Sequence, residues 1–201
     1  MTSEAWIIHT RLHGDTSVNV RFFTDQHGML ECRFRGGRTA KNHALLTPFM
    51  RLWLDHTMRY QMNFVRSLEC QAPAFSLIGN SLWAGLYTNE LLYYALPLSD
   101  PYPVLFRAYI ALLSILNNHP ERSLLEQSLR SFEWVLLKEC GYQLQLESLQ
   151  GFPFAKDILL RIVNGQFSHP EVLKPAKLIM RQAITDLLDG RPLLSRTLFV
   201  K

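Results

Sequence analysis

The sequence predicts a two-domain protein of the α+β class, in which a five-stranded β-barrel is followed by an all-helical bundle. In the first seventy residues, short segments rich in β-branched and aromatic residues are separated by turns that contain glycine. From about Asn80, apolar residues follow the 3.6-residue period of helices instead. We therefore expect a barrel domain over residues 1–79 and a helical domain over residues 80–201.

Five strands are expected, because each segment alternates apolar and polar residues at least in part. The segments are Ala5–Leu12, Ser17–Thr24, Met29–Arg35, Phe49–Met58 and Asn63–Cys70. Residues 13–15 (HGD) and 25–28 (DQHG) have the composition of turns between the first three strands. The longest connection follows the third strand.

Five helices are expected in the second domain, and prolines and glycines indicate where they begin and end. They run from Asn80 or Ser81 to about Leu96, from Asp100-Pro101 onward, from His119-Pro120-Glu121 to Gly141, from about Phe154 to Gly165, and from His169-Pro170-Glu171 to about Gly190. Gly141 is expected in the left-handed conformation that ends a helix.

Composition limits the class of protein. With 48% hydrophobic and 19% charged residues, the chain has a globular composition. It has no apolar run near the ~20 residues of a membrane helix and no signal-peptide pattern, so we expect a cytoplasmic protein that does not contact membranes. Cys32, Cys70 and Cys140 are far apart, which favours three free thiols over disulfides or a zinc site.

The charges are unevenly distributed along the chain. Residues 1–71 carry nine Lys and Arg against six Asp and Glu, residues 72–153 carry four against seven, and residues 154–201 carry eight against four. Two basic ends around an acidic middle indicate a polyanionic partner, although mildly basic surfaces also occur in proteins without one.

The most basic segment is RFRGGRTAKN (33–42), which has four cations, two adjacent glycines and no acid. Glycines allow backbone angles closed to other residues and a close approach to a nucleic-acid strand. We therefore predict a mobile loop that binds phosphates through Arg33, Arg35, Arg38 and Lys41. The alternative is a solvated loop whose cations serve only solubility.

Aromatic residues lie among the cations of the barrel domain. Phe22, Phe23, Phe34, Phe49, Trp53 and Tyr60 are interleaved with Arg21, Arg33, Arg35, Arg51 and Arg59. Proteins that bind single strands combine a cationic groove with aromatic faces that stack bases, so Arg51 and Arg59 are also predicted to bind nucleic acid. Most of the aromatic residues are nevertheless expected in the core. Because Arg33 and Arg35 share one face of a strand, Cys32 and Phe34 should point inward.

A second basic patch is predicted on the last helix. Lys174, Lys177 and Arg181 fall within about 60° of one another on a helix of 3.6 residues per turn. The apolar residues on the opposite face are Val172, Ala176, Ile179, Ala183 and Leu187. The basic stripe either binds phosphates or simply faces water.

The sequence contains no recognisable catalytic motif. It lacks GxSxG, GxxxxGK[ST] and GxGxxG. His9 and His13 have no third ligand at metal-binding spacing, and the acids are scattered singly. No metal, no other cofactor and no enzymatic activity are therefore predicted, and a nuclease would lack a metal site.

Five stretches, in order along the chain, resemble the RecO family of bacterial DNA recombination and repair proteins. They are IIHTRLHGDTSVNVRFFTDQHGML (7–30), RGGRTAKNHALLTPFMRLWL (35–54), AGLYTNELL (84–92), LRSFEWVLLKECGY (129–142) and GRPLLSRTLF (190–199). The resemblance covers nearly the whole chain and implies that the barrel is an OB-fold.

The resemblance also implies a nucleoid-associated recombination mediator without catalytic turnover. Such a protein binds single- and double-stranded DNA, anneals complementary strands, and acts with RecR to place the recombinase RecA on DNA coated by the single-stranded-DNA-binding protein SSB. The alternative hypothesis is an adaptor that docks SSB or RecR and binds nucleic acid only weakly. Many relatives carry a four-cysteine zinc module after the Gly-Tyr pair, but residues 142–154 contain no cysteine, so zinc is not expected.

The resemblance further implies a partner site on the helix that ends at Gly141. SSB has an acidic C-terminal tail that ends in a phenylalanine carboxylate, and Arg130 matches the arginine with which relatives hold it. Ser131 replaces a second arginine of the family motif, so Arg107 on the preceding helix is the candidate substitute. In the alternative, Arg130 is a surface residue that pairs with Glu126. The residues expected to line the pocket for the phenylalanine ring are Leu125, Leu129 and Phe132.

Overall fold

The computed structural model describes residues 2–142, 157, 160–162, 164–167 and 170–199. The chain divides into two compact units, one of Met1–Ser76 with Gly85–Phe106 and one of Leu77–Ala84 with Arg107–Lys201. Most of helix α2 (Gly79–Ala95) and the start of helix α3 (Pro103–Asn117) are therefore grouped with the strands. A functional boundary at residue 79 stays a prediction.

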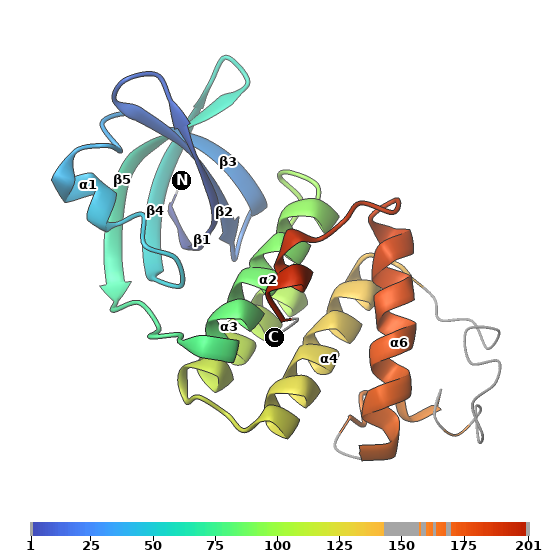
Figure 1. The fold of residues 1–201 in the computed structure, drawn as a ribbon. Coiled ribbons are helices and arrows are strands. Elements are labelled where there is room, and N and C mark those ends of the chain that lie inside the picture. Colours follow the sequence, from blue (N-terminus) through green and yellow to red (C-terminus); the bar gives the residue numbers. More distant parts are fainter. Residues whose placement is uncertain (1, 143–156, 158–159, 163, 168–169, 200–201) are drawn as a thin grey trace. The chain divides into compact units, whose positions relative to one another are not determined.

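The five predicted strands form a closed barrel (Figure 1). They are β1 (Thr2–His13), β2 (Ser17–Thr24), β3 (Gly28–Phe34), β4 (Arg51–Arg59) and β5 (Met62–Ala72). In the order β1-β2-β3-β5-β4, neighbouring strands are antiparallel except β3 and β5, which run parallel. A closed five-stranded barrel followed by helices confirms the predicted fold class and fits the OB-fold.

Side-chain burial in the barrel follows the predicted alternation. Cys32 and Phe34 are 1% and 7% exposed, which confirms that they point inward. Of the six aromatic residues that the sequence interleaves with arginines, Trp53 and Tyr60 are exposed. The other four are buried, as expected of core residues, and they are Phe22, Phe23, Phe34 and Phe49.

The turn between β2 and β3 packs against the chain that follows α2. The N–H of Ser99 donates to the carbonyl of Met29 at 2.8 Å, and Met29 also pairs with Leu98 in a short parallel bridge. Gly28 has a φ of 64°, and a Cβ atom added to it would lie 1.6 Å from the carbonyl oxygen of Asp100. Only glycine fits this position, because the backbone conformation and the close contact both exclude a side chain.

The AGLYTNELL motif joins α2 to the barrel through Asn89. The pairing of β1 with β2 shifts register between Ile7 and His9, as at a β-bulge. The side-chain amide of Asn89, which is 5% exposed, donates to the carbonyl of Ile7 at 3.4 Å. The motif thus supplies a hydrogen-bond donor to a buried carbonyl beside the bulge.

The helices follow the predicted order. After α2 and α3 come α4 (Arg122–Glu139), α6 (Pro170–Leu187) and the 3₁₀ helix η2 (Leu194–Phe199). Gly141 has a φ of 75°, which confirms the predicted left-handed end of α4. Helix α3 begins at Pro103, two residues later than the Asp100-Pro101 pair suggested. The helix expected from about Phe154 to Gly165 lies largely outside the described residues.

Within the second unit, α4 and α6 lie side by side (Figure 1). The hydroxyl of Tyr142, just after α4, donates to a carboxylate oxygen of Asp186 on α6 at 3.2 Å. The Gly-Tyr pair therefore ends α4 and contacts α6.

In the described part of the chain, no helix combines the length and the apolar character needed to cross a bilayer.

Candidate nucleic-acid interface

A row of side chains crosses the outer face of four barrel strands. Strand register places Arg11 opposite Asn19, Asn19 opposite Arg33, and Arg33 opposite Phe64. Paired residues project to the same face of a sheet, and the adjacent Val20 is fully buried in the barrel. We call these four residues, which face outward from β1, β2, β3 and β5, the Arg33 row.

Arg35 extends the Arg33 row beyond the end of β3. Its guanidinium carbon lies 5.0 Å from the centroid of the Phe64 ring, within the range of a cation–π contact. The Nε of Arg33 donates to the Oδ1 of Asn19 at 3.3 Å, which orients that guanidinium along the row. A guanidinium has five N–H donors, so Arg33 can hold Asn19 and still donate to a phosphate.

The basic stretch 33–42 folds against the β1–β2 hairpin. The backbone N–H of Arg38 donates to the carbonyl of Thr16 at 3.2 Å, and its guanidinium donates to the carbonyl of Gly14 at 3.1 Å. The Thr39 hydroxyl donates to the carbonyl of Gly36, whose φ is 69°. The stretch thus forms a hydrogen-bonded turn, and the expected mobility of this loop stays a prediction.

This turn leads into a short helix, α1 (Ala40–Ala44), which the sequence did not predict. Lys41 is exposed on it. Two cations of the stretch therefore lie on folded backbone, since Arg38 binds the β1–β2 hairpin and Lys41 lies on α1.

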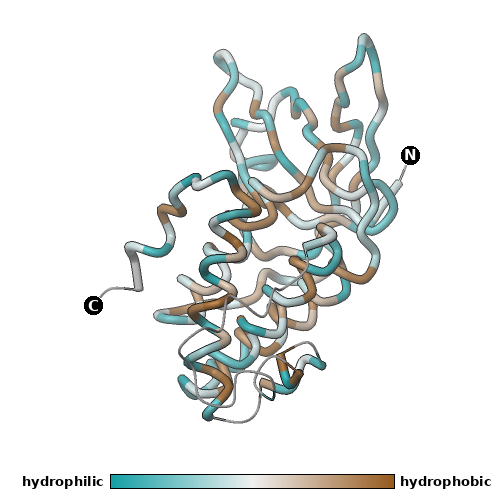
Figure 2. Tube along the Cα trace, turned by 90° about the vertical axis from the view of Figure 1, so that its right-hand side faces the viewer, coloured by the Kyte–Doolittle hydropathy of each residue, from teal (hydrophilic) through white to brown (hydrophobic). Residues whose placement is uncertain are grey.

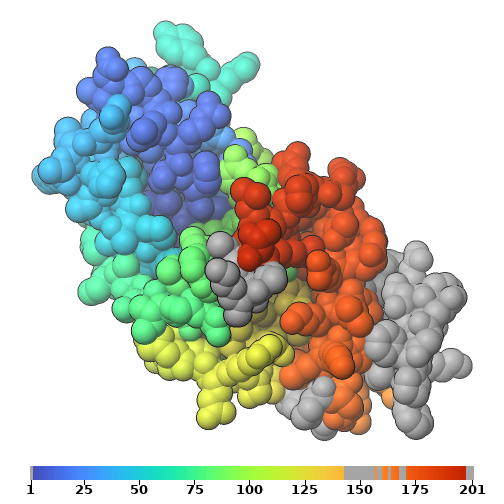
Figure 3. Space-filling model, viewed as in Figure 1, coloured from blue at the N-terminus to red at the C-terminus, as the bar shows by residue number. Residues whose placement is uncertain are grey.

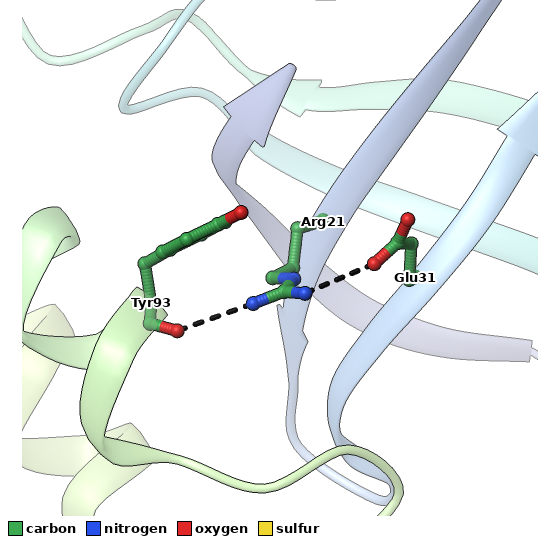
Figure 4. A network of polar contacts seen from close by, with 3 residues as sticks. All are labelled: Arg21, Glu31 and Tyr93. Carbon is green, nitrogen blue, oxygen red and sulfur yellow. Dashed lines mark hydrogen bonds and ion pairs between the residues drawn. The ribbon is translucent and has the colours of Figure 1, made fainter. Parts of the chain in front are cut away.

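Arg21 lies close to the row, but its guanidinium already contacts Glu31 and Tyr93 within the protein (Figure 4). One guanidinium nitrogen lies 3.0 Å from a carboxylate oxygen of Glu31, and another donates to the carbonyl of Tyr93 at 3.2 Å. The guanidinium carbon is 4.1 Å from the centroid of the Tyr93 ring. Arg21 therefore holds α2 against the barrel instead of offering its charge to a ligand.

A shallow pocket of about 30 Å³ opens beside the Arg33 row, large enough for one or two water molecules. The imidazole of His9 lies 4.9 Å from the Tyr93 ring, centroid to centroid. Burial, and then the positive charge of Arg21, lower the pKa of His9, which favours the neutral form of its imidazole. The residues that line the pocket are His9, Arg11, Asn19, Arg21, Glu31 and Tyr93.

Arg51 and Arg59, both predicted to bind DNA, lie at opposite ends of β4. Arg51 pairs with Glu4 at 2.7 Å, so a carboxylate already compensates its charge. Arg59 is exposed and lies two residues beyond Thr57, which pairs with Phe64 of the Arg33 row. Arg59 therefore lies on the strand beside the Arg33 row, whereas Arg51 lies at the far end of that strand.

The basic stripe on α6 has the predicted orientation. Lys174, Lys177 and Arg181 are exposed. On the opposite face of α6, Leu187 is only partly buried, and the four other predicted apolar residues are buried. These buried residues are Val172, Ala176, Ile179 and Ala183.

Arg130 on α4 is buried rather than on the surface. Its side chain is 11% exposed and donates to a carboxylate oxygen of Glu133, which is 1% exposed, at 2.5 Å. Glu126 instead pairs with Arg122 at 3.3 Å, so the alternative Arg130–Glu126 pair is wrong. Arg107 is exposed on α3. The expected pocket walls are themselves buried residues, namely Leu125, Leu129 and Phe132.

The sequence predictions missed Arg11, Asn19 and Phe64 as members of this face. Arg11 is on the polar side of a predicted strand, which was the available signal. Phe64 is distant from Arg33 in the sequence, and only the parallel pairing of β3 with β5 brings the two residues together. Among the described residues, no group of three His, Cys, Asp or Glu side chains is placed to hold a metal ion.

Comparison with known proteins identifies the family. Residues 1–73 match the family "Recombination protein O N terminal" and residues 79–149 match "Recombination protein O C terminal". A "DNA repair protein RecO" of Legionella pneumophila (strain Lens) is 39% identical, and the alignment covers 99% of each chain. The protein of that name from Stutzerimonas stutzeri (strain A1501) is 35% identical and covers 100% of this chain and 94% of its own. The chain therefore belongs to the RecO family of DNA repair and recombination proteins.

Proposed function

We propose that this protein is a recombination mediator that binds DNA along the outer face of its barrel. The DNA path consists of the Arg33 row together with Arg35, Arg38 and Arg59. The observation that carries the proposal is the convergence of cations and an aromatic ring on this face, because single-strand binders use cations for phosphates and rings for bases. Glu31 is the acid of β3 on this side, and Arg21 compensates it.

The proposed activity follows from membership of the family. The protein binds single- and double-stranded DNA, anneals complementary strands, and acts with RecR to load RecA onto SSB-coated DNA. None of these steps requires a covalent reaction, so we propose that the protein is not an enzyme and needs no cofactor.

The test is a titration of a fluorescent single-stranded oligonucleotide with the full-length protein at several salt concentrations, followed by an annealing assay with its complement. Phosphate contacts release counterions, so affinity should fall steeply as salt rises. Complementary strands should anneal faster with the protein than without it. A protein that binds no DNA at low salt contradicts the proposal.

The adaptor is the second candidate, and the Arg51–Glu4 and Arg21–Glu31 pairs favour it, because both reduce the positive charge available for DNA. An adaptor would bind an SSB tail peptide or RecR strongly and DNA weakly. Arg130, with Arg107 as the second cation, is the proposed anchor for the tail carboxylate. Measuring DNA and tail-peptide binding on the same preparation distinguishes the two functions.

The stripe on α6 is proposed to extend DNA binding to the helical unit. Its three cations, Lys174, Lys177 and Arg181, are exposed on one face of a single helix. Replacing all three by glutamine in the full chain should weaken DNA binding and reduce its salt dependence. Unchanged affinity and unchanged salt dependence in this variant would assign the stripe to solvent alone.

A further inference from the structure

The β4–β5 hairpin presents an exposed aromatic side chain at its tip. Tyr60 and Gln61 form the turn between Arg59 and Met62, which are paired, and their φ angles are 49° and 61°. Positive φ at both central residues is the signature of a type I′ turn, which favours asparagine and glycine. Neither turn residue is of the preferred type, so local backbone preference does not explain the tyrosine.

Packing does not explain the tyrosine either. Tyr60 is 101% exposed, so its ring contributes nothing to the barrel core. Met58 and Met62, which flank the turn, are 67% and 37% exposed. The hairpin, teal in Figures 1 and 3, projects from the end of the barrel, and in Figure 3 its side chains stand clear of the surrounding surface.

The hairpin tip continues the Arg33 row. Thr57 pairs with Phe64 of the row, and Arg59 lies two residues further along β4, on the same face. Arg35 stacks on Phe64, and Arg59 is adjacent to Tyr60. A cation and an aromatic ring therefore recur together from the row to the tip. The β1–β2 hairpin, which holds Arg38, projects from the same end of the barrel (Figures 1 and 2).

We propose that Tyr60 stacks on an unpaired base of bound single-stranded DNA. The inference rests on the proposed function and names the residue that distinguishes single-stranded from duplex DNA. Every base has a π face, so stacking on tyrosine is independent of sequence, whereas the bases of a duplex are already stacked on one another. The turn holds the ring away from the barrel, which leaves space for a base on its face.

The test uses Tyr60→Asn, since asparagine is favoured in a type I′ turn and the hairpin should keep its geometry. Tyr60→Phe keeps the ring, and Gln61→Asn is the matched control in the same turn. Each full-length variant is titrated with a fluorescent oligothymidine and with a strand of equal length that carries abasic positions, at two salt concentrations.

Tyr60→Asn should weaken binding of the oligothymidine by roughly five- to one-hundred-fold, the range expected for the loss of one stacked base. The salt dependence should not change, because no phosphate contact is lost. Tyr60→Phe and Gln61→Asn should bind like the wild type. On the abasic strand, the wild type and Tyr60→Asn should bind equally weakly.

Three results overturn the inference. Normal binding of oligothymidine by Tyr60→Asn shows that the ring contacts no base. An equal loss on both strands shows that the ring acts on the sugar-phosphate chain instead. A change in self-association by sedimentation, without a change in DNA binding, assigns the tip to a second copy of the chain. A wild-type protein that binds neither strand contradicts the proposed function itself and is thereby distinguished from these results.

Discussion

The guanidinium of Arg35 lies over the ring of Phe64, with its central carbon 5.0 Å from the ring centroid. Phe64 is also the residue that register places opposite Arg33. The ring therefore lies next to two arginines from a different part of the sequence. In the proposed function, this arrangement would let one short stretch of DNA contact cations for its phosphates and a ring for its bases.

The two members of this pair should affect DNA binding in different ways. Arg35→Gln should weaken binding and reduce the slope of log K against log salt by about 0.7, the effect of one contact to a single strand. Phe64→Leu should weaken binding and leave the slope unchanged. The matched control is Arg66→Gln, because Arg66 is an exposed arginine of β5 that pairs with Asp55. If Arg66→Gln weakened DNA binding as much as Arg35→Gln, the effect would depend on net charge alone and not on the position of Arg35.

The buried Arg130–Glu133 pair should contribute to stability. Arg130→Met leaves the Glu133 carboxylate, which is 1% exposed, without this partner. We expect the free energy of unfolding to fall by about 3 kcal/mol, since removing one member of a buried ion pair is costly. The double variant Arg130→Met/Glu133→Leu should recover much of the loss, because it removes both charges. Urea denaturation measures the free energy of unfolding of both variants. Equal stability of the wild type and Arg130→Met would contradict a stabilising role of the Arg130–Glu133 pair.

The same pair gives a specific test of the proposed SSB site. If Arg130 binds the tail carboxylate, the Glu133 carboxylate competes with the tail for the guanidinium of Arg130. Glu133→Gln removes this competing charge and should therefore raise the affinity for the tail peptide. Arg130→Gln should lower the affinity by about ten-fold or more, the effect of losing a charge-assisted bond. If neither variant changes peptide binding, Arg130 has a structural role only.

Gly28 should be intolerant of any side chain. Gly28→Ala would place a Cβ atom 1.6 Å from the Asp100 carbonyl oxygen and would force a positive φ on alanine. Gly14 is the matched control, because its φ is 58° and an added Cβ would meet nothing within 4 Å. Gly14→Ala should cost about 1 kcal/mol of stability through backbone conformation alone. Gly28→Ala should cost a further ~1–3 kcal/mol, and equal melting temperatures would contradict the close contact.

The strands could be predicted because alternation, β-branched residues and glycine turns agree locally. The short helix at Ala40–Ala44 could not, because five residues are too few to show a helical period. The Tyr60–Gln61 turn has no glycine or asparagine to reveal it. The alternative that placed Arg130 on the surface beside Glu126 did not consider Glu133 one turn later, whose pairing with Arg130 allows both residues to be buried.

The candidate DNA face could be predicted only in part. The cations of residues 33–42 are evident in the sequence, but their neighbours depend on strand register. Arg11, Asn19 and Phe64 come from three other strands, and no local pattern connects them. Arg51 differs from these residues because its guanidinium pairs with the carboxylate of Glu4 on β1.

The three thiols should differ in reactivity. Burial raises the pKa of Cys32 to about 12 and the pKa of Cys140 to about 11. At pH 8, both therefore exist almost entirely as the unreactive thiol, whereas Cys70 is exposed. A thiol reagent at pH 8 should modify one cysteine quickly in the folded protein and all three in urea. Rapid modification of Cys32 without denaturant would contradict the closed barrel core.

The most direct test of the account is the salt dependence of single-stranded DNA binding when the row is neutralised. Arg11, Arg33 and Arg35 are replaced together by glutamine, and circular dichroism confirms that the variant is folded. In the control variant, Arg51 and Arg66 are replaced by glutamine, because their charges are already paired with Glu4 and Asp55. The account predicts that the slope of log K against log salt falls by about 2 in the triple variant, from three lost phosphate contacts, and is unchanged in the control. A folded triple variant with the wild-type slope and affinity would contradict the assignment of this face to DNA.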